Sequence, residues 1–168
     1  MPSLQLNIST LAKETVSECI EKKVTFGTAE SCTGGLMSAS VTDVAGASAV
    51  FFGGIVSYDN SVKEKLLGVP TQTLAEKGAV SPETAGAMSA GARRALGVDY
   101  AVAVTGFAGP SGGGTPDKPV GLVYVSVASE NGVTVTENHF SGDREAVRLQ
   151  TVEKALTLLL ETVKDESR

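Results

Sequence analysis

The chain begins with apolar residues at helical spacing. Leu4, Ile8, Leu11, Thr15 and Cys19 fall three or four positions apart, which predicts an amphipathic helix over residues 4–22. Short β-branched runs then alternate with further helical patterns. We expect strands over residues 24–29, 51–58 and 100–104. We expect helices over residues 36–42, 70–76 and 82–96, and a further helix that begins at residue 62.

The carboxy-terminal part has a different pattern. Two alternating segments, residues 121–129 and 133–140, flank Glu130-Asn131-Gly132, whose Asn-Gly pair is typical of a tight hairpin. A last helix is predicted over residues 143–164. The most economical fold is an α/β class, single three-layer domain over residues 1–168, in which helices cover both faces of a mixed sheet and the hairpin is its antiparallel part.

Composition and charge limit the kinds of molecule that this protein is expected to bind. The 168 residues are 42% hydrophobic and carry a formal charge of −5, which disfavours general attraction to nucleic acid or to an anionic membrane. No segment has the roughly 20 apolar residues of a membrane span, and the first residues lack the basic and apolar regions of a signal peptide. We therefore expect a cytoplasmic protein without a disulfide framework. With one histidine, we expect no metal site.

The segment FFGGIVSYDNSVK, residues 51–63, carries the first candidate chemistry. With Ser48 just upstream, Tyr58 and Lys63 complete a set of side chains suited to acyl transfer. Ser61 to Glu64 fits a capping box, which would place Lys63 at the second helical position. There the helix dipole disfavours an ammonium, but only by about 0.3–1 kcal/mol at an exposed end. A useful base would therefore also need burial, and a solvated surface lysine is the alternative.

Glycine-rich turns lie near the predicted strand ends, at residues 31–35, 46–48 and 105–114. In open α/β sheets, ligands bind outside the carboxyl ends of strands, where such loops present backbone N–H groups. These turns are therefore the expected walls of a site. None is a dinucleotide fingerprint in its proper context or a Walker A loop.

Residue chemistry alone leaves the nucleophile open. Cys32 is intrinsically more nucleophilic than a serine, and a helix amino terminus lowers the pKa of a thiol. The favoured alternative for Cys32 is a small buried residue under the turn. Ser31 and Thr33 are equally suited to capping the next helix.

Arg144 and Arg148 lie four residues apart in the first turns of the last helix and share a face. An arginine pair there can grip a phosphate. Local ion pairs with Asp143 and Glu145 are the alternative.

Several separate motifs, taken together and in this order, resemble those of the carboxy-terminal domain of the CinA competence/damage-inducible family. They are TAESCTGG (residues 28–35), VAGAS (44–48), the GxVSYxNxxK pattern ending at Lys63, GAVS (78–81), TGxAGPxGG (from Thr105), KPVG (from Lys118) and FxGDRxxVR (from Phe140).

This resemblance implies a nicotinamide-nucleotide amidase, which converts nicotinamide mononucleotide and water to nicotinate mononucleotide and ammonia. It implies Ser48 as nucleophile, Lys63 as base and Tyr58 as hydrogen-bonding partner, with no cofactor and no metal. It also places Thr105 and the glycine-rich turns around the substrate. Arg144 and Arg148 are the residues that we expect to hold its phosphate. The expected contacts in those turns are Ser31, Thr33, Gly34 and Gly106.

Two other functions stay open. A nucleotide-binding or protein-interaction module would keep the pocket without catalysis, and an amidase could act on another pyridine amide. The expected partner is a small nucleotide, not nucleic acid or membrane, and a homodimer is also possible.

Overall fold

The computed structural model describes residues 1–113 and 115–166. Its centre is a sheet in the order β2-β1-β3-β4-β5. The strands are β1 (Phe26–Glu30), β2 (Phe51–Val56), β3 (Tyr100–Gly106), β4 (Leu122–Ser129) and β5 (Gly132–His139). Strands β1, β2 and β3 run parallel, and β4 and β5 add the antiparallel part.

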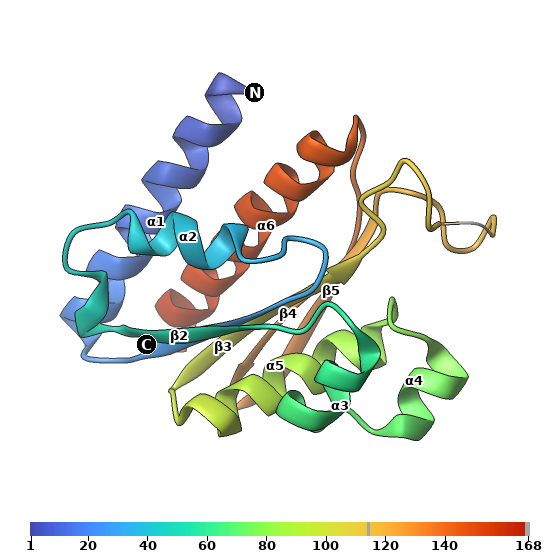
Figure 1. The fold of residues 1–168 in the computed structure, drawn as a ribbon. Helices are drawn as coiled ribbons and strands as arrows, with labels where there is room; N and C mark the ends of the chain where they lie inside the picture. Colours follow the sequence, from blue (N-terminus) through green and yellow to red (C-terminus); the bar gives the residue numbers. More distant parts are fainter. Residues whose placement is uncertain (114, 167–168) are drawn as a thin grey trace.

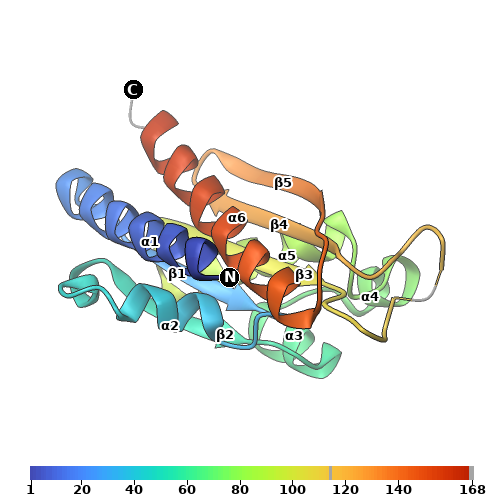
Figure 2. The ribbon, with the colours of Figure 1, turned by 90° about the horizontal axis from the view of Figure 1, so that it is seen from above.

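Helices cover both faces of the sheet, as the hydrophobic pattern predicts (Figure 1). One layer holds α1 (Pro2–Lys22), α2 (Leu36–Thr42) and α6 (Arg144–Asp165). The other holds α3 (Asn60–Leu67), α4 (Thr71–Lys77) and α5 (Pro82–Leu96). Seen from above, α1, α2 and α6 lie across the strands while α5 lies behind them (Figure 2). The three-layer fold class is confirmed.

Each layer buries its own apolar cluster against the sheet. Val102 and Val104 of β3 point toward α1 and α6, whereas Ala101 and Ala103 point toward α5. Both sets are fully buried, because alternate residues of a strand face opposite sides. This explains why β3 reads as one continuous apolar run.

Local capping signals place α5 where the sequence predicts it. Ser81 accepts a hydrogen bond from the backbone N–H of Thr84 (3.1 Å), and Pro82 occupies the first helical position. Gly97 ends the helix in the left-handed conformation, with φ 63°.

The hairpin between β4 and β5 is also confirmed, with a small shift of its turn. Ser129 pairs with Gly132, so the connecting residues are Glu130 and Asn131. Gly132 itself, with φ 129°, already belongs to β5.

The crossing of α3 over α5 predicts a stability effect. A methyl group at Gly91 would overlap the carbonyl oxygen of Leu67 at the end of α3. Gly91→Ala should therefore lower the free energy of unfolding by about 1–3 kcal/mol, since the two helices must separate. Urea unfolding measures this loss.

Gly86→Ala is the matched control in the same helix. Its added methyl would lie 3.6 Å from Val133 and Val135, an ordinary contact. The higher helix propensity of alanine should leave this variant neutral or up to about 1 kcal/mol more stable. Equal effects of both substitutions would contradict the close α3–α5 contact.

Candidate active site

The carboxyl ends of β1, β2 and β3 meet at one edge of the sheet, where a pocket of about 240 Å³ opens. Each strand supplies one wall: Ser31 and Cys32 follow β1, and Tyr58 and Lys63 follow β2. Residues 105–108 are the end of β3 and the two residues after it. Ala79, Val80, Ser111, Gly112 and Arg144 complete the lining. The pocket lies where open α/β sheets commonly bind ligands.

Lys63 is the most unusual side chain of this pocket. It is only 1% exposed, and no ion pair involves it among the residues that the structure describes. Its Nζ donates hydrogen bonds to the carbonyl oxygens of Ser57 (2.6 Å) and Tyr58 (3.1 Å). Burial lowers the pKa of Lys63, and the nearby Asp59 carboxylate opposes this shift.

The third neighbour of the Lys63 amine is the hydroxyl of Ser31. Nζ and Ser31 Oγ are 3.2 Å apart. A neutral amine has two N–H donors and one lone pair. The charged amine donates to all three oxygens. In the neutral form, with both remaining donors on the carbonyls of Ser57 and Tyr58, the lone pair would face Ser31, as a general base requires.

Helix α3 positions Lys63 differently from the predicted capping box. The N-cap is Asp59, whose carboxylate accepts a hydrogen bond from the backbone N–H of Ser61 (2.9 Å). Ser61 is therefore inside the helix, and its hydroxyl donates to the same carboxylate. Lys63 is the fourth helical residue, so burial, more than the helix terminus, lowers its pKa.

The structure does not bring Ser48 to Lys63. Ser48 is exposed in η1 (Ala47–Ala49), before β2, where it lines a separate hollow with Gly46 and Phe51. Lys63 follows β2. The six residues of this strand span roughly 20 Å at about 3.3 Å each, which puts the two side chains at opposite ends of the sheet.

Tyr58 and Arg144 stand together at the mouth of the pocket. The Tyr58 side chain is exposed, and its hydroxyl accepts a long hydrogen bond from Arg144 Nη2 (3.4 Å). Arg144 Nη1 donates to the carbonyl oxygen of Gly109 (2.8 Å). Arg144 thus joins two walls, and no acidic side chain of the described residues lines the pocket.

Arg148 has a different place from Arg144. Its Nε donates to the carbonyl oxygen of Cys32 (3.1 Å) and its Nη2 to that of Thr33 (2.8 Å). Arg148 therefore supports the backbone of the 31–35 turn and does not line the pocket.

The remaining predicted contacts divide in the same way. Thr105 and Gly106 line the pocket, and Thr105 Oγ1 donates to the carbonyl oxygen of Ala79 (2.7 Å). Thr33 is fully buried beneath the turn, and Gly34 is exposed with φ 59°. Neither lines the pocket.

Cys32 lines the pocket but lacks the environment of a reactive thiol. Burial raises the pKa of Cys32 to about 11, and the opposing effect of Arg148 is smaller. Cys19 lies in the apolar core, and burial raises its pKa to about 12. Both side chains are suited to packing.

Sequence reasoning missed two residues that organise the pocket, Glu30 and Ser57. Glu30 ends β1 and is fully buried; its carboxylate accepts hydrogen bonds from the segment after Ser31. A lone charge ending the strand FGTAE was the available signal. Ser57 acts through its backbone carbonyl, which no side-chain pattern reveals.

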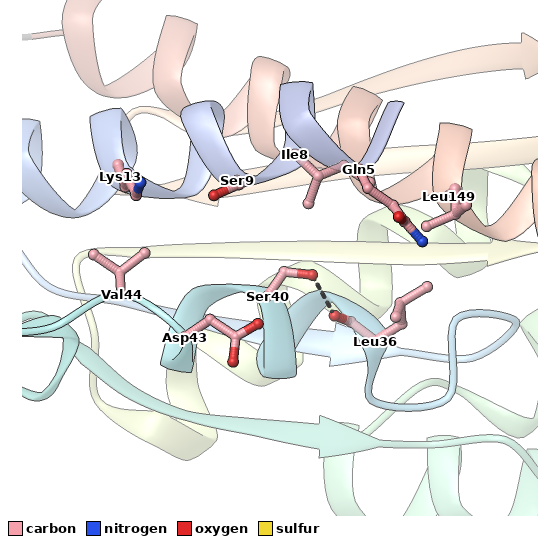
Figure 3. A pocket seen from close by; sticks show the side chains of 9 residues that line it. All are labelled: Gln5, Ile8, Ser9, Lys13, Leu36, Ser40, Asp43, Val44 and Leu149. Atoms are coloured by element: carbon pink, nitrogen blue, oxygen red, sulfur yellow. Dashed lines mark hydrogen bonds between the residues drawn. The ribbon is translucent and has the colours of Figure 1, made fainter. Parts of the chain in front are cut away.

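A second pocket, of about 310 Å³, lies between α1, α2 and α6 (Figure 3). Ser40 of α2 lines it and donates to the carbonyl oxygen of Leu36 (2.8 Å). Lys13 and Asp43 lie on opposite sides of this pocket. It holds none of the predicted site residues.

The described residues contain no group of three or more histidine, cysteine, aspartate or glutamate side chains that could hold a metal ion. None of the helices within residues 1–113 and 115–166 is long and apolar enough for a membrane crossing.

The sequence matches the family described as "CinA C-terminal domain" over residues 8–163. The chain belongs to this family. Its fold matches the crystal structure of a competence/damage-inducible protein from Agrobacterium tumefaciens, with a TM-score of 0.89 and 43% identity over 92% of this chain and 94% of that one. A CinA superfamily protein from Klebsiella pneumoniae matches with a TM-score of 0.90 and 32% identity over 94% and 98%.

Longer relatives share the same region. A CinA-like protein of Geobacter sulfurreducens is 55% identical over 139 residues, which is 83% of this chain and 33% of that protein. A putative competence-damage inducible protein of Moorella thermoacetica is 46% identical over 150 residues, or 89% and 36%. This CinA domain thus spans about a third of these relatives.

The thiol environments predict slow alkylation. Iodoacetamide should modify neither Cys19 nor Cys32 appreciably in the folded protein at mildly alkaline pH, because burial keeps both protonated and covered. Both should react in concentrated urea, and peptide mass mapping distinguishes the two states. Rapid labelling of Cys32 in the folded protein would instead indicate an accessible thiolate.

Proposed function

We propose that this CinA domain hydrolyses the carboxamide of nicotinamide mononucleotide, with Ser31 as nucleophile and Lys63 as base. The observation that carries the proposal is the 3.2 Å contact between Lys63 Nζ and Ser31 Oγ inside the pocket. Family membership and the amidase activity that the motifs imply support the choice of reaction. Ser31, and not Ser48, is the nucleophile in this proposal, because Ser48 precedes β2 whereas Lys63 follows it.

The first half of the reaction forms an acyl-enzyme. Ser31 Oγ attacks the carboxamide carbon while Lys63 Nζ takes the hydroxyl proton. Backbone N–H groups of the glycine-rich turns around the pocket stabilise the oxyanion. When the C–N bond breaks, Lys63 returns the proton to the departing nitrogen, and ammonia leaves.

Water completes the turnover. Lys63, neutral again, takes a proton from water as its oxygen attacks the ester carbon. The bond to Ser31 Oγ then breaks, the serine regains a proton, and nicotinate mononucleotide leaves.

The pocket mouth suits an anionic substrate. Arg144 is its exposed cation, and a guanidinium binds phosphate through charge-assisted hydrogen bonds. The hydrogen bonds of Arg148 already go to the 31–35 turn. We therefore assign the substrate phosphate to Arg144, with Tyr58 beside it.

The choice between the two serines is a direct prediction. Ser31→Ala should abolish ammonia release from nicotinamide mononucleotide while preserving the fold, because it removes the attacking oxygen and little packing. Ser48→Ala should keep near-normal turnover, since its hydroxyl is exposed outside the pocket. An inactive Ser48→Ala beside an active Ser31→Ala would reverse the assignment.

Lys63 should impose a pH dependence on turnover. The reaction needs the neutral amine, and burial lowers the pKa of Lys63 below the ordinary 10.5. Log kcat/KM should therefore rise with pH up to this lowered pKa and then level off. Lys63→Arg should lose at least about 100-fold in kcat/KM, because a guanidinium stays protonated; near-normal turnover of this variant would reduce Lys63 to a fixed charge.

The same shift has a consequence for stability. Between the lowered pKa and 10.5, the unfolded chain binds a proton at Lys63 that the folded protein does not. The contribution of Lys63 to the free energy of unfolding should therefore increase as pH rises through this window. Comparison with Lys63→Met, whose side chain does not titrate, isolates that contribution.

A further inference from the structure

Glu30 carries a fully buried carboxylate immediately before Ser31. Its Oε1 accepts hydrogen bonds from Thr33 Oγ1 (2.7 Å) and the backbone N–H of Met37 (2.9 Å). Its Oε2 accepts from the backbone N–H of Ser38 (3.1 Å) and from Ser38 Oγ (2.6 Å). All four donors therefore belong to the segment that follows the proposed nucleophile.

We infer that Glu30 is a positioning residue, which fixes the turn after β1 so that Ser31 Oγ meets Lys63 Nζ; the inference rests on the proposed Ser31–Lys63 reaction. β1 fixes one end of the turn, and the carboxylate fixes the other by binding the start of α2. The Ser31 backbone lies between these two anchors. Its hydroxyl is thereby held for attack, without contact between Glu30 and the substrate.

The backbone of Glu30 serves the base as well. Its carbonyl oxygen accepts hydrogen bonds from the backbone N–H of Ser57 (2.7 Å) and from Ser57 Oγ (3.3 Å). The Ser57 carbonyl oxygen in turn accepts from Lys63 Nζ. One residue thus anchors the nucleophile through its side chain and the base through its main chain.

The carboxylate is matched to its donors and not to a cation. No ion pair involves Glu30 among the described residues, so N–H and O–H donors and the start of α2 compensate its charge. A glutamine could not replace it without loss. In either orientation, its NH₂ group would face a backbone N–H, that of Met37 or that of Ser38.

The packing of α2 on the sheet leaves little room for adjustment. Ser38 Oγ, which donates to Glu30, also lies 2.7 Å from Thr28 Oγ1 of β1. A methyl group at Gly54 of β2 would overlap both hydroxyls. The substitution Glu30→Gln should therefore displace the 31–35 turn and leave α2 in place.

The test compares Glu30→Gln with the unaltered protein. With nicotinamide mononucleotide, kcat should fall by at least about 100-fold, whereas KM should stay within about threefold because Arg144 and Thr105 still line the pocket. Circular dichroism and thermal unfolding establish that the variant is folded. Normal kcat in folded Glu30→Gln would overturn the inference, and so would a loss confined to KM.

A milder pair of variants carries the test if Glu30→Gln does not fold. Ser38→Ala removes one donor to the carboxylate and should lower kcat about tenfold, near the lower value of a hydrogen bond to a charge, again with KM unchanged. Ser40→Ala is the matched control in the same helix. The Ser40 hydroxyl donates to the carbonyl oxygen of Leu36 and lines the pocket between α1, α2 and α6. Equal kcat values for these two variants would contradict the inference.

A serine-directed fluorophosphonate separates this inference from the choice of substrate. Ser31 Oγ bonds to phosphorus, fluoride leaves, and Lys63 takes the hydroxyl proton. Labelling of the unaltered protein at Ser31, slowed about tenfold or more in Glu30→Gln, supports positioning even if nicotinamide mononucleotide is not hydrolysed; that result would reject only the substrate. Equal labelling rates would overturn positioning alone, and no labelling of Ser31 in the unaltered protein would overturn both proposals.

Discussion

The site depends on a buried amine that has no carboxylate partner within residues 1–113 and 115–166. The Lys63 amine is buried, and the two backbone carbonyls and one hydroxyl around it carry no full negative charge, so burial disfavours its charged form and lowers its pKa. A carboxylate in the same place would stabilise the ammonium and remove the base that we propose. Two acidic residues beside the pocket segments have other partners: Asp59 caps α3 and Glu30 binds the start of α2.

The parallel half of the sheet brings these groups together. β1, β2 and β3 end at the same edge, so Ser31, Lys63 and Thr105 meet although they are far apart in the chain. The antiparallel hairpin contributes no residue to this pocket. It widens the sheet on which α5 and α6 pack, and α6 places Arg144 at the pocket mouth.

Sequence reasoning succeeded where the signal is local and failed where it is tertiary. The caps of α5, the buried run of β3 and the hairpin follow from neighbouring residues, and all three were predicted. The start of α3 was wrong because Asp59 and Ser61 both have capping side chains, and only the backbone decides between them. Ser48 seemed close to Lys63 because spacing along a chain does not reveal which end of a strand a loop occupies.

A direct measurement of the central claim is the protonation of Lys63 itself. Selective ¹³Cε labelling of lysine, with Lys63→Met to assign the signal, gives its pKa by NMR titration. We expect Lys63 to titrate clearly below the other lysines and below 10.5, with a signal that changes in Ser31→Ala. Titration of Lys63 together with the surface lysines, unaffected by Ser31→Ala, would contradict the account of a buried base facing Ser31.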